Sequence, residues 1–304
     1  MDFTVSKLTP EIGAEIRGLD LREPLDDETL AQVRQVWLDH VIVLFPEQEI
    51  DDDQQIEFSR RIGELELINM AALQMRGKPE IYRATNLNDD DTLMAEDHPI
   101  MQTNRDNQRW HTDSSFKRIP AMASALHARI VPDSGGETEF ANTAAAYDAL
   151  DDDTKKRIED LVVVHNFFWS RRDAQEVAFT EEEKAAIPPV RHPLARIHPE
   201  TGRRAIYAGS HAEQIEGMSW EDSRDLIDRL NDHATQARFT YRHDWKVGDM
   251  VLWDNRAALH RGLAFDAAHQ RRRLHRTTVA GTAPTLKTIP FGNRCTETVT
   301  WRDT

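Results

Sequence analysis

The chain has 304 residues, of which 39% are hydrophobic and 30% are charged, and its formal net charge is −15. This acidic balance excludes a typical nucleic-acid-binding protein, because such a protein carries a basic stripe. No apolar run is long enough to span a bilayer, and we expect no secretion signal because the amino terminus lacks basic and apolar regions. Cys295 is the only cysteine, so no internal disulfide is possible and we expect a cytoplasmic protein.

The first third of the chain predicts a helix, a strand and a second helix. Asp26 and Asp27 precede apolar residues at helical spacing, which indicates a helix start. The run 41–45 is β-branched and aromatic and ends at a proline, as a buried strand does. A second helix is expected from about 51 to 62, because its first three residues are aspartates and a glycine follows it.

The region from about 71 to 109 has lost this periodicity and is rich in asparagine and aspartate. The sequence therefore predicts a long loop, and we interpret 66–109 as a lid over a functional site. A calcium-binding loop at 86–91 is excluded, since its glycine and its terminal glutamate are missing.

The remainder of the chain predicts alternating strands and helices. Strands are expected at 122–131, 138–142, 194–198, 204–208, 238–242, 250–254 and 271–280, and helices around 144–161, 181–186 and 219–232. Repeats and linkers are missing from the sequence, which predicts one domain over 1–304.

The segment Trp110–Phe116 holds the first candidate site. His111 and Asp113 lie two residues apart, so on an extended backbone their side chains share one face. An imidazole and a carboxylate presented in this way can bind one metal ion. With a second histidine they would form the facial triad of non-haem Fe(II) oxygenases. A solvated turn is the alternative for so short a motif.

His260 is the candidate for the third ligand, because it lies just past the strand predicted at 250–254. Two histidines and a carboxylate suit Fe(II) and leave one face of the ion open. Zinc is the competing metal, since the same ligands with a water molecule form a hydrolytic site. A zinc metallohydrolase and a non-catalytic binding module are the alternatives from other functional classes.

Arg272 and Arg276 lie on one face of the last predicted strand. Facing a core, they would need anionic partners, because an unpaired buried charge is costly. They could then bind a dicarboxylate cosubstrate and an anionic substrate. An exposed arginine-rich strand is the alternative, because Arg271 and Arg273 lie on the other face.

Four motifs together resemble the taurine dioxygenase and 2,4-dichlorophenoxyacetate dioxygenase family. They are His111-x-Asp113, the segment 135–140, the segment 253–260 and the strand with Arg272 and Arg276. The segments 110–116, 144–150 and 241–245 resemble the phenoxyacetate branch of this family most closely. The resemblance covers nearly the whole chain. It implies a mixed α/β fold, with a double-stranded β-helix (a cupin-like jelly roll) and flanking helices.

The resemblance also implies roles for the site residues and a reaction. The iron ligands would be His111, Asp113 and His260, the 2-oxoglutarate anchors Thr138 and Arg272, and the substrate's anion clamp Arg276. The implied enzyme is an Fe(II)- and 2-oxoglutarate-dependent dioxygenase that consumes O₂ and is helped by ascorbate in vitro. It would hydroxylate, and thereby cleave, a small carboxylate such as an aryloxyacetate, releasing succinate and CO₂. The retained Asp113 disfavours the halogenating variants.

The sequence departs from the taurine-type enzymes at 67–70, where it lacks their sulfonate-binding histidine. A sulfonate or alkyl sulfate substrate therefore becomes the alternative within the same chemistry. We expect Ile68 and Phe116 to contact an aromatic or alkyl body. His198 and His211 resemble positions near the pocket, with a purely structural role as the alternative. The expected partner is a small anionic organic substrate, neither nucleic acid nor a membrane, and a homo-oligomer stays open.

Overall fold

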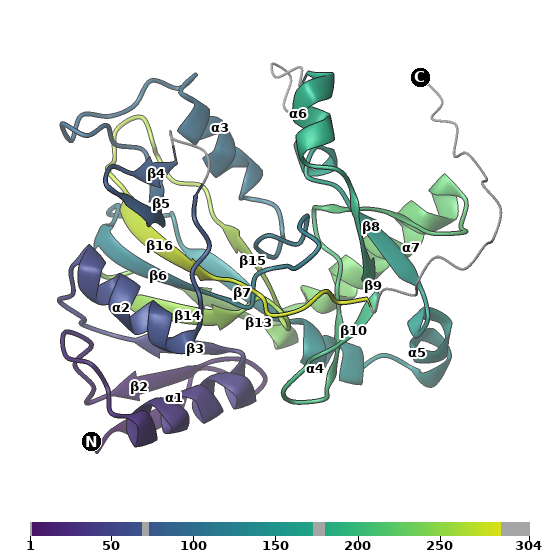
Figure 1. Cartoon of the computed structure of the whole chain (residues 1–304), viewed down its shortest axis with the longest axis horizontal. Coiled ribbons are helices and arrows are strands. Elements are labelled where there is room, and N and C mark those ends of the chain that lie inside the picture. Colours follow the sequence, from purple (N-terminus) through teal and green to yellow (C-terminus); the bar gives the residue numbers. More distant parts are fainter. Residues whose placement is uncertain (1, 69–72, 173–179, 287–304) are drawn as a thin grey trace.

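A central eight-stranded sheet organises the fold (Figure 1). Its strands are rich in apolar residues, and alternate residues along each strand face opposite sides of the sheet. The computed structural model describes residues 2–68, 73–172 and 180–286. Among the described strands of this sheet, only β2 and β3 pair in parallel. In spatial order the strands are β1 (Thr4–Lys7), β2 (Ala14–Arg17), β3 (Ile42–Phe45), β14 (Met250–Asp254), β6 (Ala123–Ile130), β16 (Arg273–Val279), β5 (Lys78–Thr85) and β4 (Gln74–Met75).

A second, three-stranded sheet packs on one face of the large sheet. Its strands are β13 (Thr240–His243), β7 (Thr138–Asn142) and β15 (Ala258–Gly262), with β7 in the middle. Phe140 of β7 is fully buried, and its ring centroid lies 5.5 Å from that of Trp253 on β14. The two sheets enclose a shared apolar core, which confirms the expected jelly roll.

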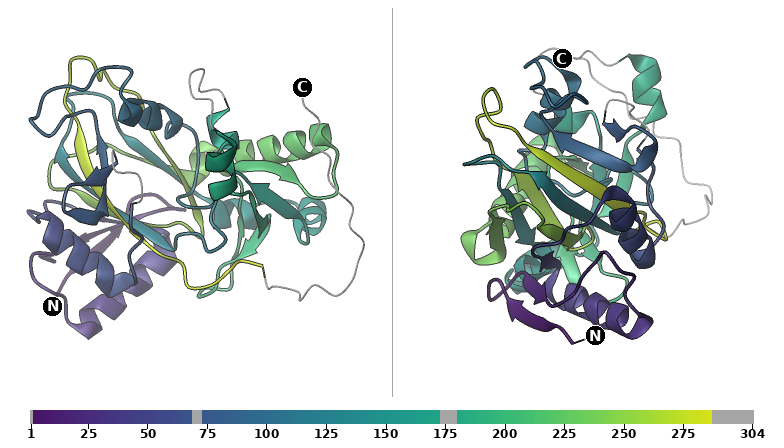
Figure 2. Two further views of the ribbon diagram at one scale, coloured as in Figure 1. Left: turned by 45° about the horizontal axis from the view of Figure 1, so that its top comes forward. Right: turned by 90° about the vertical axis from the view of Figure 1, so that its left-hand side faces the viewer.

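Two helices cover the opposite face of the large sheet, α1 (Asp27–His40) and α2 (Asp52–Ile62), drawn purple and dark blue in Figures 1 and 2. They bury Trp37 and Phe58 against the sheet residues that point away from the first core. Asp26 and Asp51 cap their first turns by accepting backbone hydrogen bonds, as the aspartates in the sequence predicted. Among the described residues, none of the helices has the length and apolarity needed to cross a bilayer.

The segment between β7 and β13 forms a second apolar cluster beside the jelly roll (Figure 1). A three-stranded sheet in the order β12-β8-β9 and a hairpin of β10 and β11 support it. Its elements are α4 (Thr143–Asp148), α5 (Asp152–Ile158), β8 (Val162–His165), η1 (Trp169–Arg171), α6 (Glu181–Ala186), β9 (Val190–Pro193), β10 (Ala195–Ile197), β11 (Arg204–Ile206), β12 (Ala212–Ile215), α7 (Trp220–Ala234) and η2 (Ala237–Phe239).

The region 66–109 is not a single loop, so this prediction was wrong in part. β5 pairs along β16 in the large sheet, and α3 (Pro99–Asp106) follows it. The strand escaped recognition because only three of its eight residues are buried, so its apolar alternation is weak. Residues 69–72 lie outside the described residues, and the role of the remainder as a lid stays a prediction.

Several other strands were not predicted, and one predicted site residue lies elsewhere than expected. The four-residue strands β1, β2, β8, β9 and β12 were not predicted, and β1 is exposed throughout. His260 lies within β15 rather than past a strand, since a three-residue turn separates β14 from a further short strand. This placement fixes the backbone of His260 more firmly, because both of its neighbours are also paired with β7.

A buried histidine in β6 makes stability depend on pH. Burial, assisted by Arg129, lowers the pKa of His127 to about 4. Its Nε2 lies 2.8 Å from the carbonyl oxygen of Gln48, and its Nδ1 has no hydrogen-bond partner among the described residues. The unfolded chain, with a histidine pKa of about 6.5, binds more protons than the folded chain between these values. Stability from this residue is therefore lost as pH falls from about 6.5 to about 4.

The substitution His127→Gln should remove this dependence, because glutamine stays neutral and can still donate to Gln48. Urea unfolding of metal-free protein should show that the wild type loses about 3 kcal/mol more than the variant between pH 7 and pH 4. Equal losses in the two proteins would refute this assignment.

Candidate active site

The two histidines are brought together by the backbone. His111 donates its amide to the carbonyl oxygen of His260 at 3.0 Å, and His260 returns the bond at 2.8 Å. These two hydrogen bonds form an isolated β-bridge, which attaches the backbone at His111 to β15. The two ring centroids lie 4.2 Å apart. The sequence-predicted triad is therefore assembled from three buried residues, whose ligand atoms lie within 4.8 Å of one another.

The carboxylate of Asp113 is held on both oxygens. Ser124 donates its hydroxyl to Oδ2 at 2.7 Å, and Arg276 donates Nη1 to Oδ1 at 2.6 Å. Burial by itself would raise the pKa of Asp113, but the charge of Arg276 and the hydrogen bond from Ser124 outweigh it and hold the pKa well below its usual range. Asp113 is thus a carboxylate in a fixed orientation at any physiological pH.

Asn255 connects this carboxylate to the sheet. Its Oδ1 accepts hydrogen bonds from the amide of Asp113 at 3.2 Å and from Nε1 of Trp253 at 3.0 Å. Its Nδ2 donates to the hydroxyl of Ser124 at 3.0 Å. The sequence marked Trp253 and Asn255 only as part of a family motif, and Ser124 gave no signal. Their contacts show that they orient Asp113.

The donor set fits a divalent metal ion. Burial lowers the pKa of both His111 and His260, which keeps the imidazoles neutral as ligands must be. Nδ1 of His111 lies 2.8 Å from the carbonyl oxygen of Arg109, so it carries the proton and Nε2 is left for a metal. Nε2 of His260 and Oδ2 of Asp113 lie 3.7 Å apart. This is too long for a hydrogen bond, but both atoms could reach one ion at about 2.1 Å.

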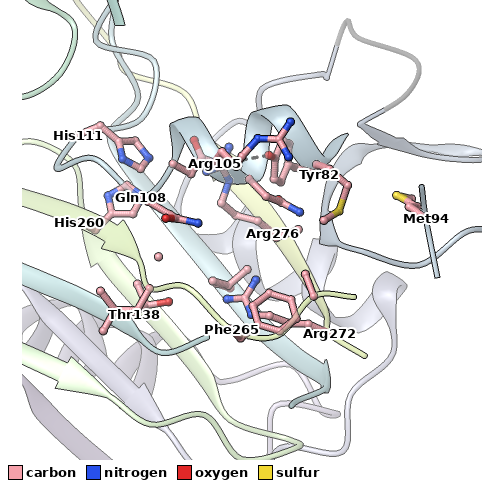
Figure 3. Close-up of a pocket in the computed structure, with 18 of the residues that line it drawn as sticks. Tyr82, Met94, Arg105, Gln108, His111, Thr138, His260, Phe265, Arg272 and Arg276 are labelled. Carbon is pink, nitrogen blue, oxygen red and sulfur yellow. Dashed lines mark hydrogen bonds between the residues drawn. The ribbon is translucent and has the colours of Figure 1, made fainter. Parts of the chain in front are cut away.

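A cavity of about 550 Å³ opens beside the two imidazoles (Figure 3). Thr138 and Arg272 line it away from the histidines, and Arg276 lies between the two groups. Arg272 has no anionic partner among the described residues, and its Nε is buried without a hydrogen bond. Burial lowers the pKa of Arg272 to about 10. A buried cation in this state requires an anion from outside the chain.

Thr138 and Gly136 lie at the same end of the cavity as Arg272. Trp245 donates Nε1 to the hydroxyl oxygen of Thr138 at 3.0 Å, which leaves the hydroxyl proton to donate to a ligand. Gly136 adopts φ +73°, and a Cβ there would lie 3.2 Å from Nε of Arg272. The glycine of the 135–140 motif therefore leaves room for the guanidinium.

The four arginines, two within β16 and two directly before it, separate into an inward-facing pair and an outward-facing pair, as the inward-facing alternative predicted. Arg272 and Arg276 line the cavity, whereas Arg271 and Arg273 form exposed ion pairs with Asp91. The guanidinium of Arg276 also lies over the ring of Tyr82, 4.4 Å from its centroid. The alternative of an exposed arginine-rich strand is excluded for Arg272 and Arg276.

A second cavity, of about 530 Å³, also borders the triad, at His111 and Asp113. Its apolar wall includes Ile68, Phe116 and Phe167, and the rings of Phe116 and Phe167 meet edge to face at 4.8 Å. His111 and Arg276 line both cavities. The candidate metal centre therefore lies where the cavity lined by Arg272 and Thr138 meets the cavity lined by aromatic rings.

The two further histidines have different places. His211 lines the second cavity, and its ring centroid lies 6.4 Å from that of His111. His198 instead donates Nε2 to Asp254 at 2.9 Å inside the core and lines neither large cavity. His198 is thus a structural histidine, whereas His211 belongs to the site.

Comparison with known proteins decides the family. The family model described as "Taurine catabolism dioxygenase TauD, TfdA family" matches residues 4–278. The chain belongs to this family. A 2,4-dichlorophenoxyacetate dioxygenase of Cupriavidus pinatubonensis, described as alpha-ketoglutarate-dependent, is 38% identical over 281 residues, which cover 91% of this chain and 98% of the relative. An (S)-phenoxypropionate/alpha-ketoglutarate dioxygenase of Sphingobium herbicidovorans is 35% identical over 285 residues, covering 92% and 95%.

A solved structure of AAD-2 in complex with Mn(II) and N-oxalylglycine superposes with a TM-score of 0.87. It is 40% identical in sequence and covers 95% of this chain and all of the other. This dioxygenase therefore depends on Fe(II), 2-oxoglutarate and O₂, as the resemblance in its sequence implied. The alternatives of a zinc hydrolase and a binding module are excluded.

Proposed function

We propose that this enzyme hydroxylates a small organic monoanion, with aryloxyalkanoic acids as the substrate class. The observation that carries this proposal is the charge of the site. Bound Fe(II) and 2-oxoglutarate would cancel each other's charge, and Asp113 cancels one of the arginines Arg272 and Arg276. A third arginine at the site, Arg171, is balanced by Asp106. One positive charge is left in a site where an uncompensated charge is costly, so the substrate should supply a single negative charge.

Each site residue then has a role. We assign Fe(II) to His111, Asp113 and His260, the distal carboxylate of 2-oxoglutarate to Thr138 and Arg272, and the substrate's carboxylate to Arg276. The bound iron supplies the O₂-dependent oxidation that turns 2-oxoglutarate into succinate and CO₂ and hydroxylates a substrate C–H bond. The chain supplies position and a dry site, since the three ligands are only 5–6% exposed.

The second cavity suits an aromatic body. Phe116 and Phe167 form its aromatic wall and Ile68 adds apolar surface, so we propose that they contact the substrate ring. The names of the relatives that act on 2,4-dichlorophenoxyacetate and phenoxypropionate support the same class. Hydroxylation of the carbon next to the ether oxygen would give a hemiacetal, which collapses to a phenol and an oxo acid. We further propose a single catalytic domain, acting in a reducing cytoplasm that suits Fe(II) and a lone cysteine.

Succinate release across a substrate panel tests the proposal. With Fe(II), ascorbate, air and 2-oxoglutarate, we expect aryloxyacetates and aryloxypropionates to stimulate succinate formation at least about 10-fold over the rate without substrate. Other carboxylates, sulfonates and alkyl sulfates complete the panel. Stimulation by a sulfonate or sulfate ester alone would replace the carboxylate proposal with its alternative. Slow succinate formation that no compound stimulates would refute both.

A further inference from the structure

A third arginine faces the substrate cavity from outside the jelly roll. Arg171 ends η1 and lines the same cavity as Phe116 and Arg276. Its guanidinium lies over the ring of Phe167, 3.6 Å from the centroid, and its Nη1 donates to the carbonyl oxygen of Phe167 at 3.2 Å and to the hydroxyl of Ser170 at 2.9 Å. With 17% of its side chain exposed, Arg171 is a held and largely dehydrated cation.

Its carboxylate partner is poorly placed. Asp106, the last residue of α3, has Oδ2 3.6 Å from Nε of Arg171, which is too long for a hydrogen bond. The side chain of Asp106 is 10% exposed. Burial lowers the pKa of Arg171 and raises that of Asp106, so the pairing does not fully offset desolvation for either group. The guanidinium therefore has capacity for a better-placed anion.

We propose that Arg171 is a specificity-determining residue that binds the carboxylate of the substrate together with Arg276, in place of Asp106. This inference rests on the proposed function and names a recognition residue in the same site. Both arginines line one cavity together with Tyr82 and the metal ligand His111. Phe167, packed between Arg171 and Phe116, joins the anion site to the aromatic wall.

The arrangement predicts opposite effects for the two partners. Arg171→Gln removes a charge-assisted donor to the substrate and should raise the KM of the best aryloxyalkanoate by about 10- to 100-fold. Asp106→Asn removes the competing carboxylate and should bring that KM below the wild-type value. If the ion pair served only to fix α3 on η1, both substitutions would weaken substrate binding alike.

Three controls accompany the measurement. Arg172→Gln alters the neighbouring arginine, which is exposed and packs over Trp169 with 4.0 Å to the ring centroid, and it should leave the KM unchanged. The KM for 2-oxoglutarate should stay at the wild-type value in every variant, which shows that the site is folded. Arg171→Lys keeps the charge and should recover part of the lost affinity.

A neutral amide of the same substrate separates the effect of the substrate's negative charge from that of its shape. Arg171→Gln should cost much less with the amide than with the acid, because only the acid presents an anion. The inference is overturned if Arg171→Gln changes the KM no more than Arg172→Gln, or if Asp106→Asn raises it. A wild-type enzyme that no carboxylate stimulates would overturn the proposed function itself, before any variant is compared.

Discussion

Asp113→Ala should form no detectable succinate from 2-oxoglutarate, with or without a primary substrate. Asp113 is the only charged member of the three-residue cluster and is held on both oxygens by Ser124 and Arg276. Its removal leaves two neutral imidazoles beside an arginine that has lost its partner. A divalent cation is then held by two ligands and repelled by Arg276, so metal affinity should fall as well.

Ser124→Ala is the comparison variant for this prediction, and its effect should be smaller. It removes one hydrogen bond to Oδ2 and keeps the carboxylate, so metal affinity should fall only about 10- to 100-fold. Titration with Fe(II) under argon, followed by succinate assays in air, separates binding from turnover. An Asp113→Ala variant with wild-type turnover would remove this carboxylate from the proposed metal centre.

The sequence was most informative where the residue type is dictated by chemistry. His111, Asp113 and His260 could be proposed as ligands because few side chains bind metals, and period two placed Arg272 and Arg276 on one face. Residue types alone could not predict that His260 lies next to His111. That contact depends on one backbone bridge between segments about 150 residues apart, which no local pattern predicts.

What the sequence missed depends on tertiary contacts. β5 has a weak apolar pattern and is recognised as a strand only through its pairing with β16. Ser124 resembles any small strand residue until its hydroxyl is seen on Asp113. Arg171 lies in a 3₁₀ turn, and it belongs to the site only because η1 packs near the end of α3. Each of these positions is set by packing that overrides local propensity.

Arg272→Met should make the ligand-free protein more stable and at the same time abolish tight 2-oxoglutarate binding. The folded-state pKa of Arg272, about 10, lies below its ordinary value because burial penalises the cation. At neutral pH the residue is charged in both states, so the folded protein bears the whole penalty. Replacing it with methionine should raise the free energy of unfolding by about 2 kcal/mol in the absence of ligand.

The affinity for 2-oxoglutarate should move in the other direction. The distal carboxylate would keep the Thr138 hydroxyl but lose its charge-assisted donors, so KM for 2-oxoglutarate should rise on the order of 100-fold. Addition of 2-oxoglutarate and Mn(II) should then raise the melting temperature of the wild type but not of the variant. Arg276→Met is the comparison within the same cavity and should raise the KM of the primary substrate instead. Because Arg276 also holds Asp113, its loss should weaken metal binding, so both variants are assayed at saturating Fe(II). A ligand-free Arg272→Met protein that is less stable than the wild type would show that an internal partner satisfies this guanidinium, and the cosubstrate would lose its proposed anchor.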